Sequence, residues 1–157
     1  MPKSSIPVPH LPQELDYSCV PACIRMVLAL YGLPVPESQL RALFKTRPSG
    51  TSLANVLLRL PELGMSASVY SASLFELERY LESGTPCIVQ VWTEHLSYWR
   101  EAWMHDMVVV GIEGDTVLVN DPAFPDAPKA IAKSEFERAW AAADRLLIRI
   151  EKIAPSA

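Results

Sequence analysis

Residues 13–32 read QELDYSCVPACIRMVLALYG, a short polar lead followed by an almost wholly apolar run. Ser18 or Asp16 can cap a helix that runs to about Tyr31, and the glycine after it can end that helix. A single charged residue, Arg25, interrupts the apolar part. We therefore expect this helix to be central and buried on most sides.

The rest of the chain divides into further helices and strands by its hydrophobic periodicity. Helical patterns cover residues 35–45, 51–64, 73–84 and 133–143. Strand patterns cover residues 66–72, 86–92, 105–112, 116–120 and 145–150. Helices come first, and mostly antiparallel strands with inserted helices follow. This order indicates an α+β fold rather than alternating βαβ units.

Composition limits the kind of protein this can be. The 157 residues predict a single domain, 1–157, in which the proline-rich residues 1–12 form an extended lead-in. The net charge of −4 argues against a nucleic-acid partner. No apolar run reaches the roughly 18 residues of a membrane span, and the N-terminus has no secretory signal pattern. Three cysteines are too few for a disulfide scaffold, so we expect reduced thiols in the cytoplasm.

Cys19 is the thiol whose position favours reactivity. It would lie in the first helical turn, where the helix dipole and unpaired N–H groups stabilise a thiolate. Cys23 lies one turn further in and Cys87 lies in a predicted strand, so both are expected to pack as small apolar residues. Most free cysteines are packing residues, so the position of Cys19 does not by itself establish a nucleophile.

A nucleophilic thiol needs a general base, and His105 is the best placed histidine. It opens the apolar run HDMVVVGI, where a rigid strand would present an imidazole. His10 and His95 lie in polar or proline-rich stretches and are expected at the surface. Asp121, at the end of VLVNDPA, is the candidate that orients His105, although NDP is also a common turn signal.

The turn between these two strands decides whether His105 and Asp121 can meet. A two-residue loop at 114–115 places the two side chains on opposite faces of the sheet. A three-residue loop at 113–115 pairs Met107 with Asp121, which leaves His105 and Asp121 as diagonal neighbours about 7–8 Å apart at Cα. A His–Asp pair therefore predicts the odd-length loop or an equivalent bulge.

Gln13 is the candidate oxyanion donor. It precedes Cys19 by six residues, so its side-chain amide can swing over the helix start and join the backbone N–H of Cys19. A lone glutamine at this spacing would otherwise be an exposed polar residue. Together, Gln13, Cys19, His105 and Asp121 predict attack of a thiol on a carbonyl group.

These segments resemble the C39 family of papain-like cysteine peptidases. The stretch QELDYSCVPACIRMVLALYG is similar to the family's nucleophile segment, and HDMVVVGIEGDTVLVNDPA is similar to its His–Asp hairpin. The resemblance covers about residues 9–150. It implies a papain-like fold, in which a central helix that starts at the nucleophile packs on a mostly antiparallel sheet. It also implies roles: Cys19 as nucleophile, His105 as base and then acid, Asp121 as its orienting partner and Gln13 as oxyanion donor.

The resemblance also implies partners. The best-known family members cut leader peptides after a double glycine and sit at the front of ATP-driven peptide exporters. We expect a peptide substrate, no cofactor and no metal, and a bacterial enzyme that acts free or beside a separate exporter.

Three features depart from the family or are distinctive of this chain. Ser18 and Val20 stand where the family often has Asp and usually has Gly, and a branched Val20 would narrow the approach of substrate. The aromatic stretch 92–103 would either wall the groove beside His105 or simply pack a long connection.

The sequence is therefore compatible with three functions. The first is a cysteine peptidase or amidase that works through a Cys-His-Asp triad and an acyl-enzyme, with acyl transfer to an amine as a variant. The second, favoured by Val20, is a catalytically silent module that binds peptides in a papain-like groove. The third is a metal site of Cys19, Cys23 and His105, for which C-x3-C without a second pair is a poor signature.

Overall fold

Helices cover both faces of a single antiparallel sheet in this protein. The computed structural model describes residues 5–154, and within them six strands pair in the order β1-β6-β2-β3-β4-β5. The strands are β1 (Met65–Ser71), β2 (Cys87–Trp92), β3 (Met104–Glu113), β4 (Thr116–Asn120), β5 (Lys129–Ala132) and β6 (Leu146–Lys152). The helices are α1 (Cys19–Leu30), α2 (Glu37–Leu43), α3 (Leu53–Arg59), α4 (Leu74–Glu82) and α5 (Lys133–Ala141), with 3-10 turns η1 (Leu60–Leu63) and η2 (Thr93–His95).

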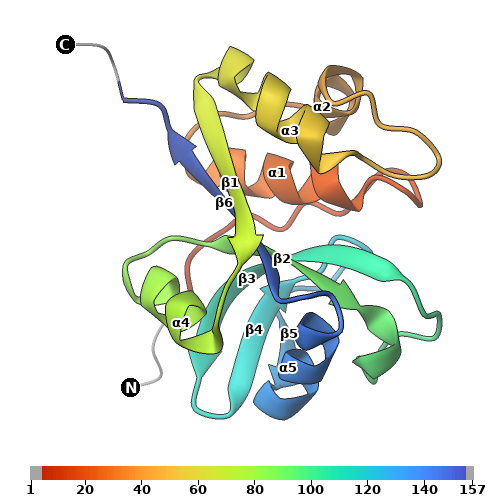
Figure 1. Ribbon diagram of the computed structural model, residues 1–157, viewed down its shortest axis with the longest axis vertical. Coiled ribbons are helices and arrows are strands. Elements are labelled where there is room, and N and C mark those ends of the chain that lie inside the picture. The colour runs from red at the N-terminus through yellow and green to blue at the C-terminus, as the bar shows by residue number, and fades with distance from the viewer. Residues whose placement is uncertain (1–4, 155–157) are drawn as a thin grey trace.

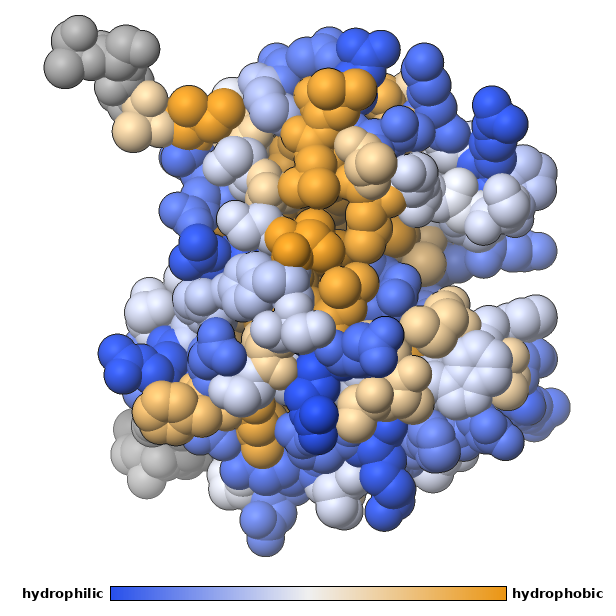
Figure 2. Space-filling model, in the orientation of Figure 1, coloured by the Kyte–Doolittle hydropathy of each residue, from blue (hydrophilic) through white to orange (hydrophobic). Residues whose placement is uncertain are grey.

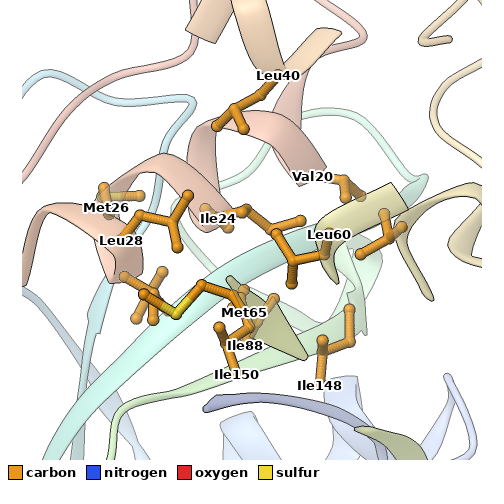
Figure 3. Close-up of a cluster of buried hydrophobic side chains, with 14 of the residues drawn as sticks. Val20, Ile24, Met26, Leu28, Leu40, Leu60, Met65, Ile88, Ile148 and Ile150 are labelled. Carbon is orange, nitrogen blue, oxygen red and sulfur yellow. The ribbon is translucent and has the colours of Figure 1, made fainter. Parts of the chain in front are cut away.

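The alternation of apolar side chains along β3 builds two cores. Val108 and Val110 face the layer of α1, α2 and α3, whereas Met107 and Val109 face the layer of α4 and α5. Figure 1 shows these two helical layers on either side of the sheet. Figure 3 shows side chains of α1, such as Ile24, packed toward the strands. The predicted α+β class, with a central helix against an antiparallel sheet, is confirmed.

The start of α1 differs in one respect from the prediction. Ser18 occupies the cap position, but its side chain makes no capping bond. Its buried hydroxyl instead donates to Oε1 of Glu37 (3.1 Å) and bonds the backbone of Leu15. The Ser18 hydroxyl bonds Glu37 instead of the N–H groups of the first helical turn, because Glu37 is a buried carboxylate that needs hydrogen-bond donors.

Two other elements differ from the sequence prediction. The helix expected over 51–64 ends at Arg59 and continues as the 3-10 turn η1, since Pro61 lacks an N–H and strains an α-helical turn. Strand β5 was not predicted, because its four residues follow a proline-rich loop and show almost no pattern. The helix expected over 73–84 is present as α4, and it begins with a capping box in which Ser73 and Glu76 bond each other's backbone N–H.

The hairpin of β3 and β4 combines a short turn with a bulge. Glu113 pairs with Thr116, so the loop has two residues. The register then shifts between Val109 and Gly111, which leaves Val110 as an extra residue. Val110 has no partner residue in β4, and its carbonyl instead accepts a hydrogen bond from the N–H of Ile6 in the lead-in (2.8 Å). The prediction of an odd loop or an equivalent bulge is confirmed in its second form.

The lead-in also ties the N-terminal segment to β4. Asn120 donates to the carbonyl of Val8 (3.1 Å), and the Gln13 N–H donates to the carbonyl of Pro122 (2.8 Å). Residues 5–12 have no helix or strand, as expected for an extended segment; the first four residues of the predicted lead-in lie outside the described part. These contacts place the residues before α1 next to the residues after β4.

One face of the molecule is apolar over α3 and β1. Figure 2 shows a band of hydrophobic side chains in this region. Leu57 and Leu58 of α3 are exposed, Leu58 by 72%. Across residues 5–154, no helix combines the length and the apolar character that a membrane crossing requires.

Candidate active site

Cys19 is the first residue of α1 and stands at the wall of an open cavity of about 940 Å³. Its side chain is half-buried, whereas Cys23 and Cys87 are fully buried. His105 and Gln13 line the same cavity. The structure thus brings together three of the four residues singled out in the sequence around one accessible space.

His105 and Asp121 form a buried pair behind this cavity. The Nε2 atom of His105 lies 2.7 Å from Oδ1 of Asp121. His105 is 4% exposed and Asp121 is fully buried. Because Nε2 is engaged by Asp121, Nδ1 is the ring nitrogen left to face a thiol. Asp121 therefore sits where it can fix the orientation of the imidazole.

The surroundings of His105 favour its charged form. Burial by itself lowers the pKa of this imidazole, but hydrogen bonds to Asp121 and to the Cys19 side chain outweigh it and raise the pKa to about 10. Asp121 responds in the opposite direction. Burial raises the pKa of its carboxyl, yet His105, the Ala123 N–H and Tyr98 together lower it. The hydrogen-bonded environment of His105 therefore favours the protonated form of the imidazole.

Two aromatic residues also bind Asp121, and the sequence reasoning did not find them. The Tyr98 hydroxyl and the Trp99 indole N–H both donate to Oδ2, at 2.7 and 2.9 Å. They belong to the aromatic stretch 92–103, for which a groove wall was one expectation. Trp99 and Trp103 do line the cavity. The missed signal was chemical: the N–H of a half-buried Trp and the O–H of a half-buried Tyr usually find an acceptor, and Asp121 supplies it.

Gln13 lines the cavity, but the N–H groups of its side-chain amide already bond backbone carbonyls. Nε2 donates to the carbonyls of Leu15 (2.8 Å) and Asp16 (3.2 Å). The Oε1 atom is buried and has no hydrogen-bond partner within residues 5–154. The amide therefore lies near the helix start as expected, with its donors turned to the backbone.

Val20 does not narrow the site. Its side chain is 6% exposed and belongs to the same apolar core as Leu60, which Figure 3 draws with both residues labelled. Val20 is absent from the described residues around the cavity. The expectation that a branched residue after the thiol would restrict substrate is wrong, because the first helical turn directs this residue inward.

The two remaining cysteines are core residues, as predicted. Burial raises the pKa of the Cys23 thiol well above its usual value, and nearby Asp106 adds to this effect. Burial likewise raises the pKa of Cys87 to about 12. Among residues 5–154, no group of three His, Cys, Asp or Glu side chains is arranged to hold a metal ion.

His10 is less exposed than expected. It is half-buried, and its Nε2 atom lies 2.7 Å from the carbonyl of Phe124. His95, in η2, is also half-buried. Both histidines thus remain partly exposed at the surface, and His10 in addition fastens the lead-in to the loop after Asp121.

Glu37 is a further residue that the sequence reasoning missed. It is fully buried at the start of α2. Its Oε1 accepts the Glu14 N–H (3.0 Å) and the Ser18 hydroxyl, and its Oε2 accepts Nε of Arg41 (2.8 Å). Glu37 thereby fixes the segment between Gln13 and Cys19.

Comparison with known proteins identifies the family of this chain. The Peptidase C39 family matches residues 8–151. The chain is 30% identical over 128 residues to the lactococcin-G-processing and transport ATP-binding protein LagD of Lactococcus lactis subsp. lactis. The aligned part covers 82% of this chain and 17% of LagD, so the chain spans a small part of that relative's length.

Solved structures share the fold over nearly the whole chain. One is a double glycine motif protease from an AMS/PCAT transporter, in complex with the leader peptide (TM-score 0.74, 25% identity, 96% of this chain and 97% of that chain). Another is the peptidase domain of Streptococcus ComA, a bi-functional ABC transporter involved in quorum sensing (TM-score 0.74, 25% identity, 90% and 96%). The fold, the arrangement of side chains at the start of α1 and the family match agree: the chain belongs to the Peptidase C39 family.

Proposed function

We propose that this protein is a cysteine peptidase in which Cys19 is the nucleophile, His105 the general base and acid, and Asp121 the residue that orients His105. One observation carries the proposal. The half-buried thiol at the start of α1 and the His105–Asp121 pair meet at the same open cavity. A thiol, a base and an orienting group in this order are the requirements for covalent catalysis.

The first half of the reaction forms an acyl-enzyme. The Cys19 thiolate attacks the carbonyl carbon of the substrate, and the carbonyl electron pair moves to oxygen. The backbone N–H of Cys19 stabilises that oxyanion. The Gln13 amide joins it by releasing the longer of its two bonds, to the Asp16 carbonyl. His105 then gives its proton to the leaving amine as the C–N bond breaks.

The second half releases the product. Neutral His105 takes a proton from water as that water attacks the thioester carbonyl. The C–S bond breaks, the acid product leaves, and the proton on His105 restores the imidazolium beside the thiolate. Asp121 stays ionised throughout, because the donors around it lower the pKa of its carboxyl despite burial.

The proposed substrate is a leader peptide that ends in a double glycine. The relatives support this class, since one of the similar structures is a double glycine motif protease bound to its leader peptide. An open cavity suits a peptide chain that must pass along the thiol. The peptide would reach this enzyme either free or at an exporter.

A silent peptide-binding module is the second candidate. Val20 was the feature that favoured it, and its side chain lies in the core instead of the cavity. A module that only binds peptides would not need a half-buried thiol at the same cavity as a histidine whose pKa is raised. The peptidase is therefore the better supported of the two.

Cleavage of synthetic leader peptides tests the proposal. Peptides with Gly-Gly and with Ala-Ala or Val-Val at the junction are incubated with the parent, Cys19→Ala and Cys23→Ala, and products are identified by mass spectrometry. We expect one cut after Gly-Gly by the parent and by Cys23→Ala, and none by Cys19→Ala. Binding of the peptide by the parent without any cut would support the silent module.

A further inference from the structure

We propose that Tyr98 and Trp99 are positioning residues, whose side-chain donors hold Asp121 in the orientation that directs His105 toward Cys19. The inference rests on the proposed function, since it assigns a role within the same site. It concerns residues that act through Asp121 and need not touch the substrate.

Four donors surround the Asp121 carboxylate. Oδ1 receives His105 Nε2 (2.7 Å) and the Ala123 N–H (3.0 Å). Oδ2 receives the Tyr98 hydroxyl (2.7 Å) and the Trp99 indole N–H (2.9 Å). A carboxylate offers about four lone-pair sites, so this one is fully engaged. Rotation of the carboxylate away from His105 would break at least two charge-assisted hydrogen bonds.

Trp99 links the carboxylate to the imidazole directly. Its ring centroid lies 4.7 Å from that of His105, with the planes inclined by 57°. Trp99 also lines the cavity, whereas Asp121 is fully buried. The indole thus restrains the histidine ring on one side and separates the His–Asp pair from solvent in the cavity.

The aromatic pair is itself held in place. Phe124 packs edge-on against Tyr98 and Trp99, at centroid distances of 5.1 and 5.3 Å. The ammonium of Lys129 lies over the rings of Phe124 (4.8 Å) and Tyr98 (5.4 Å). The geometry around Asp121 is therefore built before any substrate binds.

A threonine closes the loop that carries these aromatics. The buried Thr93 hydroxyl donates to the Glu101 carbonyl (2.6 Å) and accepts the Trp103 N–H (2.9 Å). The backbone N–H of Thr93 donates to the Trp103 carbonyl (2.9 Å). The loop is thus joined at its base, and Tyr98 and Trp99 project from a fixed segment.

These contacts keep Tyr98 protonated and Asp121 charged. Burial raises the pKa of Tyr98, and the neighbouring Asp121 raises it further, so Tyr98 stays a neutral donor. Both donors stabilise the charged carboxylate against the effect of burial. Loss of either one leaves the carboxylate free to rotate away from His105, which weakens the His105–Asp121 hydrogen bond and lowers the pKa of His105.

Conservative variants separate this role from a merely structural one. Trp99→Phe and Tyr98→Phe keep the rings and remove the N–H or O–H. The matched controls are Trp140→Phe, which removes a buried indole N–H that bonds the Leu146 carbonyl (2.9 Å), and Tyr80→Phe, which removes a hydroxyl that bonds Tyr70. Both controls lose a comparable hydrogen bond at places that do not contact Asp121.

The readout is the titration of the His105 ring by NMR, with cleavage kinetics beside it. We expect Trp99→Phe and Tyr98→Phe each to increase the acid dissociation constant of His105 about tenfold and to lower kcat about tenfold at unchanged KM. The two controls should titrate and cleave like the parent. An unchanged His105 titration in Trp99→Phe and Tyr98→Phe would overturn the inference. The titration needs no peptide, so failure of the proposed function would appear in the cleavage assay alone.

Discussion

His105 and Asp121 face one another because β3 carries an extra residue between them along the hairpin. Val110 forms the bulge, and the 2.7 Å hydrogen bond between His105 Nε2 and Asp121 Oδ1 follows from the register that it sets. With the two-residue turn and no bulge, the side chains would point to opposite faces of the sheet. The lead-in stabilises this register, since Ile6 bonds the Val110 carbonyl.

Gln13 is expected to act on the oxyanion and not on substrate binding. Gln13→Ala should lower kcat about 100-fold, because one oxyanion donor is lost, and should leave KM within about twofold. Steady-state cleavage of the Gly-Gly peptide measures both constants. Gln39→Ala, at an exposed position of α2, is the matched control. A raised KM with an unchanged kcat would make Gln13 a binding residue instead.

Asp106 is expected to make stability fall as the pH rises. Its side chain is buried, one oxygen has no partner in the described part of the chain, and burial raises the pKa to about 6. The folded state therefore keeps this proton to a higher pH than the unfolded chain, whose carboxyl has a pKa near 3.8. The contribution of protonated Asp106 to the free energy of unfolding is fully present below pH 3.8. It is lost as the pH rises through about 6, and the total loss is about 3 kcal/mol.

Asp106→Asn removes this titration and keeps the acceptor for Gln90. The free energy of unfolding of the variant, minus that of the parent, should increase by about 3 kcal/mol from pH 4 to pH 8. Urea denaturation across this range provides the difference, and any constant cost of the new amide cancels. Asp115→Asn, in the exposed turn of the hairpin, is the matched control. A flat difference for Asp106→Asn would mean that this carboxyl titrates alike in both states.

Glu37 is expected to stabilise the segment that leads into α1. Glu37→Ala leaves the Glu14 N–H and Nε of Arg41 without this acceptor, and the Ser18 hydroxyl with the Leu15 carbonyl alone, which should lower the free energy of unfolding by about 3 kcal/mol. Glu62→Ala, which breaks a solvent-exposed pair with Arg59, is the control and should cost less than about 0.5 kcal/mol. Equal urea midpoints for the two variants would contradict a structural role of Glu37.

Most of the fold could be predicted from the sequence because its elements carry clear local signals. Ser73 and Gly84 mark the two ends of α4, and the apolar run of β3 marks a buried strand. The short β5 has no such signal, because a four-residue edge strand is defined by its partner β4 and not by its own pattern.

The residues of the candidate site could be predicted where their reactivity or contacts depend on local secondary structure. A thiol at a helix start and the register of one hairpin follow from local geometry, so Cys19, His105 and Asp121 could be named in advance. Tyr98 and Glu37 could not, because their roles depend on partners far along the chain. The inward direction of Val20 was missed for the same reason: the core that receives it is assembled from distant elements.

The central claim is that Cys19 and His105 form a thiolate–imidazolium pair, and the rate of iodoacetamide alkylation from pH 4 to 9 tests it most directly. Modification at Cys19 is followed by mass spectrometry in the parent and in His105→Ala. The pKa of His105, raised to about 10, predicts a rate that stays high down to acidic pH in the parent and falls about tenfold or more at pH 5 in His105→Ala. A parent rate that titrates like a free thiol, and is unchanged in His105→Ala, would contradict the account.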